Sequence, residues 1–242
     1  MIRISSYFEA VRDLLFPSFC LGCRQQLPTK FCPPLFCSDC LVKIQYIRSP
    51  CCRRCGQPFP GGSDHLCSDC LRDHLVFDLA RSVFLYQDPI ASLILSLKFG
   101  GCLSSLNSLR ILALQATAQS NFSEPDLILP VPLHIQRLRQ RGFNQALLIA
   151  RSCFPQWKHK ITADLLKRSR PTIPQSVLSG KVRRENLEQA FMLAHPEQVD
   201  GKHILLVDDV YTTGSTVNEC SKILRANGAV RIEIFTLARS VY

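Results

Sequence analysis

The stretch ILLVDDVYTTGST, residues 204–216, determines the expected fold. Its four leading apolar residues are typical of a strand buried inside a parallel sheet. Two acids follow the strand, and a turn rich in Thr and Gly leads into a helix that we expect over residues 215–226. Backbone N–H groups point outward where such a turn meets the start of a helix, and they bind anions there. The stretch therefore predicts an α/β domain with an anion-binding site at the end of a strand.

The polar side chains of this stretch suit a ribose phosphate. We expect the phosphate to bind the hydroxyls and backbone N–H groups of the turn, at Thr212, Thr213, Gly214, Ser215 and Thr216. Asp208 and Asp209 can accept hydrogen bonds from two neighbouring sugar hydroxyls, or hold a divalent cation through water. The alternative is an ordinary strand, turn and helix with Thr as the cap. That alternative explains the hydroxyls but not two adjacent acids at the end of a buried strand.

The cysteines mark a second module. Ten of the 13 cysteines lie between Cys20 and Cys70, and eight of these form four Cys-x-x-Cys pairs. Two such pairs complete a tetrahedral zinc site without an open position, so we expect two structural zinc ions. The predicted ligands are Cys20, Cys23, Cys37, Cys40, Cys52, Cys55, Cys67 and Cys70. Sequential pairing is the simplest assignment, and a cross-braced arrangement stays open. The roles of Cys32 and Cys51 also stay open, because Cys51 could replace its neighbour as a ligand.

The chain is expected to divide into a Cys-rich module over residues 1–75 and an α/β domain over residues 76–242. Apolar residues within 2–16 follow helical spacing with charges on the opposite side, unlike a signal peptide. We expect a helix packed on its own protein, and contact with a membrane surface or a partner is the alternative. The absence of an export signal and of a long apolar run predicts a cytoplasmic protein whose thiols stay reduced.

The formal net charge of +10 comes from one segment. Residues 134–184 hold twelve Lys or Arg and one acid, and the rest of the 242-residue chain is nearly neutral. A concentrated excess of this kind indicates a phosphate site or a nucleic-acid-binding surface rather than a generally basic protein. Aromatic side chains are sparse in the segment, which gives only weak support to a stacking platform for single strands.

Residues 204–216 resemble the 5-phosphoribosyl-1-pyrophosphate (PRPP) signature of type I phosphoribosyltransferases, which is a hydrophobic strand, two acids and Thr-Thr-Gly-x-Thr. This resemblance implies a mainly parallel sheet flanked by helices. It places Asp208 and Asp209 on the ribose hydroxyls with Mg²⁺, and residues 212–216 on the 5′-phosphate. Thr212 stands where 6-oxopurine enzymes usually carry Asp, which argues against a hypoxanthine or guanine acceptor. The expected strands are 80–85, 126–131, 203–208 and 231–237, and the expected helices are 89–97, 104–120, 143–152 and 215–226.

Further segments resemble the ComF family, the group of ComFC and GntX-like proteins, whose N-terminal part is a double zinc ribbon. They are LKFGG (97–101), LILPVPLHIQRLRQRGFNQA (127–146) and RSRPTIPQSVLSGKVRRENLEQAF (168–191). With the Cys pairs, the resemblance covers nearly the whole chain. It implies a glycosyltransferase of the pentosyl class, which transfers ribosyl phosphate from Mg²⁺-PRPP to an acceptor in DNA uptake during natural transformation. The alternative is a non-catalytic adaptor that handles single-stranded DNA or senses PRPP.

The resemblance also assigns a role to the basic segment. In type I phosphoribosyltransferases the loop that corresponds to residues 132–142 binds pyrophosphate, and cations fit there because negative charge accumulates on the leaving group. Residues 167–186 are expected to form a long loop that closes over PRPP and excludes water. The predicted pyrophosphate and lid residues are Arg137, Arg141, Gly142, Asn144, Gln145, Arg168, Arg183 and Arg184. Binding of single-stranded DNA is the rival account of the same cations, and the two roles can coexist. Proteins of DNA uptake and processing are further expected partners of the chain.

Overall fold

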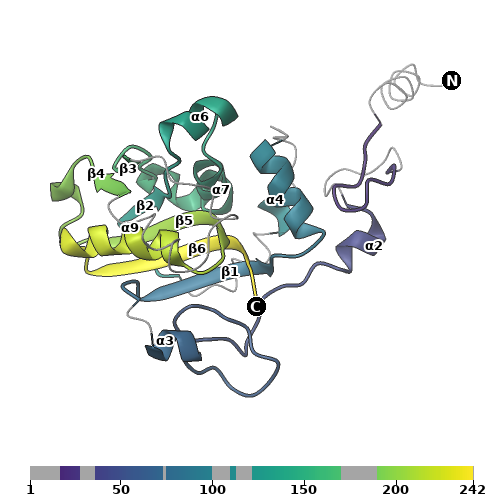
Figure 1. Cartoon of the computed structure of the whole chain (residues 1–242), viewed down its shortest axis with the longest axis horizontal. Coiled ribbons are helices and arrows are strands. Elements are labelled where there is room, and N and C mark those ends of the chain that lie inside the picture. Colours follow the sequence, from purple (N-terminus) through teal and green to yellow (C-terminus); the bar gives the residue numbers. More distant parts are fainter. Residues whose placement is uncertain are drawn as a thin grey trace.

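The structure is a computed structural model that describes residues 17–27, 36–72, 75–99, 110–112, 122–169 and 190–241. Within these ranges a four-stranded parallel sheet with the order β1–β6–β5–β2 forms the centre (Figure 1). Its strands are β1 (Leu79–Leu85), β2 (Leu127–Pro130), β5 (His203–Tyr211) and β6 (Arg231–Arg239). The mainly parallel sheet expected from the sequence is confirmed, and β5 and β6 extend further than expected.

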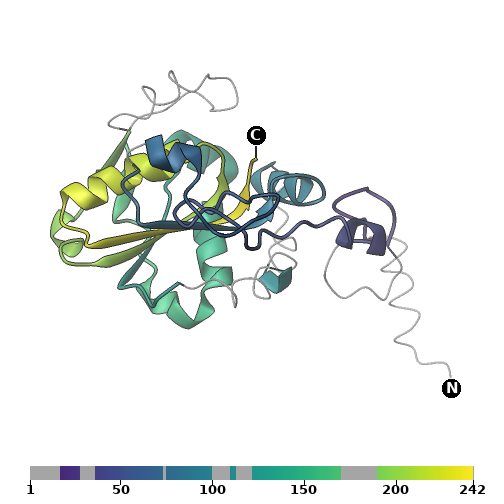
Figure 2. The ribbon, with the colours of Figure 1, turned by 90° about the horizontal axis from the view of Figure 1, so that it is seen from below.

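The two faces of the sheet carry two separate hydrophobic cores, because side chains alternate along a strand. In β5, Leu205 and Val207 enter one core with α4 (Ile90–Phe99) and α7 (Gln145–Cys153). Ile204 and Leu206 enter the other core with α9 (Ser215–Ala226). Figure 2 shows α7 and α9 on opposite sides of the sheet. The helix expected over 215–226 is confirmed, and α9 has the same bounds.

The segment between β2 and α7, expected as a loop, contains helix α6 (Ile135–Arg141). His134 caps its start and accepts a hydrogen bond from the backbone N–H of Gln136. Gly142 ends it in the left-handed conformation, which is the usual role of Gly after a helix. The loop prediction was wrong because no residue of α6 is buried, so the helix leaves no apolar periodicity in the sequence.

The segment expected as a lid begins with a strand. Residues Leu166–Arg168 form β3, which pairs in antiparallel fashion with β4 (Phe191–Leu193). The rest of the expected lid, with Arg183 and Arg184, lies outside the described residues. The helix expected over 2–16, Cys32 and nearly all of the helix expected over 104–120 lie outside them as well. Short 3-10 helices cover Pro155–Lys160 and Pro196–Gln198.

The two Cys-rich ribbons attach to different elements of the α/β domain (Figure 1). The first contains α2 (Ser38–Leu41) and packs on the start of α4, where a Cβ at Gly22 would lie 2.7 Å from the Cβ of Pro89. The second contains α3 (Ser68–Arg72) and joins β1 through a hydrogen bond from Ala80 N–H to the carbonyl of Arg54. No helix of the described ranges is both long enough and apolar enough to cross a membrane.

Candidate functional site

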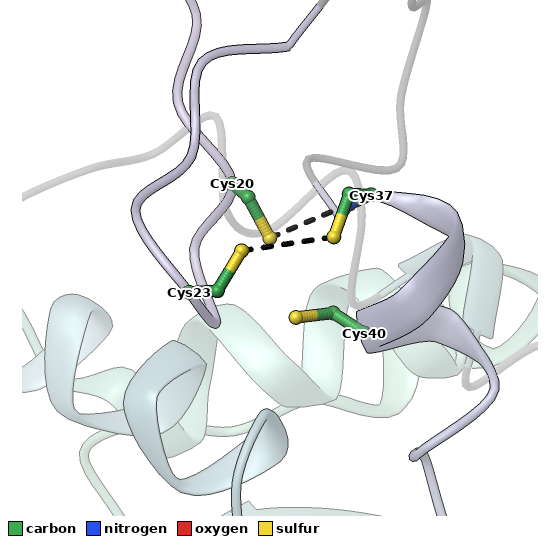
Figure 3. A group of neighbouring side chains, drawn as sticks. All are labelled: Cys20, Cys23, Cys37 and Cys40. Atoms are coloured by element: carbon green, nitrogen blue, oxygen red, sulfur yellow. Dashed lines mark hydrogen bonds between the residues drawn. The ribbon is translucent and has the colours of Figure 1, made fainter.

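Eight cysteines form two groups of four, in each of which all Sγ atoms lie within 4.8 Å of one another. The groups follow the chain order: Cys20, Cys23, Cys37 and Cys40 (Figure 3), then Cys52, Cys55, Cys67 and Cys70. The Sγ atoms of Cys23 and Cys37 are 3.7 Å apart, and those of Cys55 and Cys67 are 3.6 Å apart. Tetrahedral zinc with bonds of about 2.3 Å sets sulfur atoms roughly 3.8 Å apart. Both groups therefore fit structural zinc, with sequential pairing and without Cys51.

Backbone donors prepare one sulfur in each group. The N–H of Cys37 points to Cys20 Sγ, and the N–H of Cys67 points to Cys52 Sγ, each at 3.4 Å. Burial opposes ionisation of both thiols, but the backbone hydrogen bonds outweigh it and lower the pKa of Cys20 and of Cys52 to about 6. Thiolate is the form that ligates zinc, so these turns favour metal binding.

The turn that precedes α9 is built around Gly214. This residue adopts φ = 75°, and a Cβ at this position would collide with the hydroxyl of Tyr211, so glycine is required by both conformation and space. The hydroxyls of Thr213 and Ser215 lie 2.8 Å apart at the start of α9. The cap residue has no side chain to satisfy the start of α9, and the hydroxyl of Thr213 accepts a hydrogen bond from the N–H of Ser215 at 3.5 Å. The predicted phosphate residues 212–216 thus come together at a helix N-terminus.

The two acids lie within β5 rather than after it, because pairing with β6 continues to Tyr211. The side chain of Asp209 is directed to the face of α4 and α7, and the residue is only 6% exposed. Asp208 is half-buried on the face of α9. Burial, followed by the negative charge of Asp209, raises the pKa of Asp208 to about 7. The predicted acid pair is therefore held partly dehydrated beside the turn.

Asp209 is held by donors from two helices. Lys98 Nζ, from α4, lies 2.9 Å from Oδ2, and Gln145 Nε2, from α7, donates to the same oxygen at 3.2 Å. Arg141 in turn donates to Gln145 Oε1 at 2.6 Å. Within the described ranges both donors use Oδ2, which leaves Oδ1 to accept a hydrogen bond from a ligand. Lys98 was not among the predicted site residues, although it lies in the segment LKFGG.

Three arginines gather beside the acids. Burial lowers the pKa of Arg141 and of Arg168, and the charge of Arg137 lowers both further, whereas Asp209 and Asp208 act in the opposite direction. The guanidinium of Arg168 also lies 5.3 Å from the centre of the Phe191 ring. Although α6 and β3 are separate in sequence, the structure brings these predicted pyrophosphate residues within electrostatic range of one another and of the acid pair.

The two predicted amide donors are engaged within the protein. Asn144 caps α7 by accepting from the N–H of Ala146, and its Nδ2 donates to the carbonyl of Val131. Gln145 connects Asp209 to Arg141, as described above. In this arrangement Asn144 and Gln145 fix the start of α7 and the orientation of Asp209. Their direct contact with pyrophosphate stays a prediction.

Comparison with known proteins agrees with both halves of this description. The double zinc ribbon domain family matches residues 11–71, and the phosphoribosyl transferase domain family matches residues 160–240. The DNA utilization protein YhgH of Escherichia coli (strain K12) is 35% identical over 94% of this chain and 100% of its own length. Competence protein F of Haemophilus influenzae is 34% identical, with 91% of this chain and 96% of that protein covered. Competence protein ComFC of Bacillus subtilis is 31% identical, with 84% of each chain covered. The chain therefore belongs to the ComF family, in which a double zinc ribbon precedes a phosphoribosyltransferase domain.

Proposed function

We propose that the chain binds Mg²⁺-PRPP and transfers its ribosyl phosphate to an acceptor with release of pyrophosphate, in the handling of incoming DNA. The observation that carries this proposal is the meeting of three chemistries at one end of β5. The hydroxyl-rich turn at Gly214 follows the strand, and the acid pair lies at the end of its buried part. The arginines of α6 and β3 interact electrostatically with the two acids. Open α/β sheets bind ligands at this end of their strands.

Each part of the site has a distinct task in this reaction. The turn and the first N–H groups of α9 would hold the 5′-phosphate, as helix N-termini do for anions. Asp208 and Asp209 would accept hydrogen bonds from the ribose 2′- and 3′-hydroxyls, with Asp209 using the oxygen that Lys98 does not occupy. Carboxylate oxygens also suit Mg²⁺, which when bound would neutralise charge on the pyrophosphate.

The arginines act when the bond between the ribose C1 and the pyrophosphate oxygen breaks. The electron pair of that bond leaves with pyrophosphate, and cations placed in advance stabilise the charge that develops there. Arg137, Arg141 and Arg168 would be these cations, and their electrostatic interactions with one another and with the acid pair support this role. The new bond forms between C1 and the acceptor, so the chain itself needs only to position the two reactants and exclude water.

Titration calorimetry with PRPP tests the proposal. The unmodified chain is expected to bind PRPP with Mg²⁺ present, and the variant with Asp208→Asn and Asp209→Asn is expected to lose most of this binding. Pyrophosphate release after addition of candidate bases separates turnover from binding alone. An absence of heat with the unmodified, zinc-loaded chain would overturn the proposal.

A second candidate is a non-catalytic adaptor for single-stranded DNA. The name of the Escherichia coli relative, DNA utilization protein YhgH, gives that protein a task that involves DNA. Arg139 on α6 and Lys167 on β3 are exposed beside the site. Such cations neutralise backbone phosphates, so affinity should fall steeply with salt. Fluorescence anisotropy with labelled single strands, compared for the unmodified chain and for Arg139→Gln, measures this. Binding that is absent even at low salt excludes the adaptor.

A further inference from the structure

The last residue of β6, Arg239, is 6% exposed and contacts the second Cys-rich ribbon. Its Nη1 donates to the carbonyl oxygen of Cys55 at 2.8 Å, and its Nη2 lies 3.5 Å from the Sγ of the same residue. Its Nε donates to Oε1 of Gln57 at 2.8 Å. The buried guanidinium of Arg239 therefore contacts both the backbone carbonyl and the sulfur of Cys55, which is a predicted zinc ligand.

The same guanidinium also contacts Tyr211, the residue that precedes the turn 212–216. Its central carbon lies 4.3 Å from the centre of the Tyr211 ring, and the two residues are direct partners across β5 and β6. The hydroxyl of Tyr211 fills the space that a Cβ at Gly214 would take. One continuous line of contacts therefore runs from Cys55 through Arg239 and Tyr211 to Gly214.

Zinc sets the charge at one end of this line. Four thiolates on one zinc ion carry a formal charge of about −2, which suits a buried cation at hydrogen-bond distance from a sulfur. Partners that hydrogen-bond to a metal ligand orient that ligand and tune the site. Without the metal, Arg239 loses the anionic zinc–thiolate site that it contacts, and a buried cation without such a partner is a costly arrangement. The guanidinium is then expected to move, and the Tyr211 ring stacked on it loses its support.

We propose that Arg239 is a positioning residue that makes the phosphate-binding turn depend on zinc in the second four-cysteine group (Cys52, Cys55, Cys67 and Cys70). With zinc bound, Arg239 holds Tyr211 against Gly214 in the conformation that accepts a phosphate monoester. With zinc lost, affinity for the phosphate falls. This inference rests on the proposed function, since it takes the turn to be a phosphate site. The first four-cysteine group packs on α4 instead, so the two groups support different parts of the ligand site.

The full chain, loaded with two zinc ions, provides the test. Arg239→Gln removes the charge and is expected to weaken Mg²⁺-PRPP binding about fivefold or more. It is also expected to speed the release of one of the two zinc ions to a chromogenic chelator. Arg81→Gln is the matched control, because Arg81 also joins this ribbon to the sheet. Among the described residues its guanidinium donates to the backbone carbonyls of Ala80, Cys52 and Arg53 and to no sulfur atom. The control is expected to leave both quantities unchanged.

The unmodified chain gives a second test that needs no variant. Coupling between two binding sites is reciprocal, so Mg²⁺-PRPP should raise the affinity for the same zinc ion by the factor by which that zinc strengthens PRPP binding. Equilibrium competition with the chelator measures this affinity. This arm decides the question if Arg239→Gln does not fold. Normal PRPP binding by a folded Arg239→Gln, or a zinc affinity that bound Mg²⁺-PRPP leaves unchanged, would overturn the inference. If the unmodified chain does not bind PRPP, the proposed function itself is overturned. The effect of Arg239→Gln on zinc release does not depend on PRPP, and it still measures the contact between Arg239 and Cys55.

Discussion

Lys98 Nζ lies 2.9 Å from Oδ2 of Asp209, and this ion pair joins the last turn of α4 to the acid pair of β5. The start of the same helix packs against the first Cys-rich ribbon, where Gly22 meets Pro89. The side chain of Lys98 is 23% exposed and that of Asp209 is 9% exposed, so solvent screens the pair only in part. A charge at the ligand site is thus held in place by a helix that the ribbon supports.

Removal of this lysine should destabilise the fold through the acid that it leaves behind. Lys98→Met is expected to cost about 3 kcal/mol of unfolding free energy, because a buried carboxylate then lacks its counter-ion. Adding Asp209→Asn to Lys98→Met should restore much of the loss, since no unpaired charge remains. Urea unfolding of the single and double variants measures the difference. If the double variant is no more stable than Lys98→Met, the ion pair does not have this role.

The raised pKa of Asp208 makes stability depend on pH. Its pKa moves from an ordinary 3.8 to about 7, so the folded chain keeps a proton that the unfolded chain has released. The contribution of Asp208 to stability therefore falls as the pH rises from about 4 to about 7 and is constant above that range. The melting temperature of Asp208→Asn, relative to that of the unmodified chain, should therefore increase as the pH rises from about 4 to about 7. Melting temperatures at pH 5 and pH 8 without Mg²⁺ measure the gap, and a larger gap at pH 5 would contradict the assignment.

The turn at Gly214 should not tolerate a side chain. Gly214→Ala is expected to abolish most PRPP binding, because the new Cβ meets the Tyr211 hydroxyl and the backbone has φ = 75°. Gly201→Ala is the matched control, since Gly201 also has a positive φ of 69° but nothing lies within 4 Å of its Cβ position. The control should lose about 1 kcal/mol of stability and keep its affinity. Calorimetry on both variants compares them, and equal affinities would count against the role of the turn.

Zinc content should follow the two four-cysteine groups. The unmodified chain is expected to hold two zinc ions, and Cys37→Ser and Cys67→Ser are each expected to hold one, because each group is complete without the other. Cys51→Ser should still hold two, since this thiol lies outside both groups. Elemental analysis of the purified variants provides the count. Loss of zinc from Cys51→Ser would show that this residue is a ligand after all.

The elements that were predicted correctly are those with a strong local pattern. The apolar run 204–207 predicts β5, because a strand that is buried on both faces consists of consecutive apolar residues. The Gly-containing turn after it predicts the start of α9. Helix α6 was missed since its residues face solvent and carry no apolar stripe. The end of β5 was also misplaced, because only pairing with β6 extends it to Tyr211.

The site residues that escaped prediction depend on contacts between distant parts of the chain. Lys98 has an ordinary helical context, and only the packing of α4 beside β5 brings it to Asp209. Arg239 resembles any basic residue at the end of a strand, and its importance comes from a ribbon far away in the sequence. A single sequence indicates which residue types can bind PRPP, but it does not indicate which residues hold them in position.

The alternation of side chains in β5 has a consequence for the length of the strand. From Ile204 to Val207, successive side chains enter opposite cores. The two acids that follow have different neighbours: Asp209 contacts Lys98 and Gln145, and Asp208 interacts electrostatically with Arg168. A one-residue insertion or deletion within 204–207 would exchange the two faces, burying each acid among the wrong partners. Homologous chains are therefore expected to tolerate substitutions among the apolar residues of this strand far better than any change in their number.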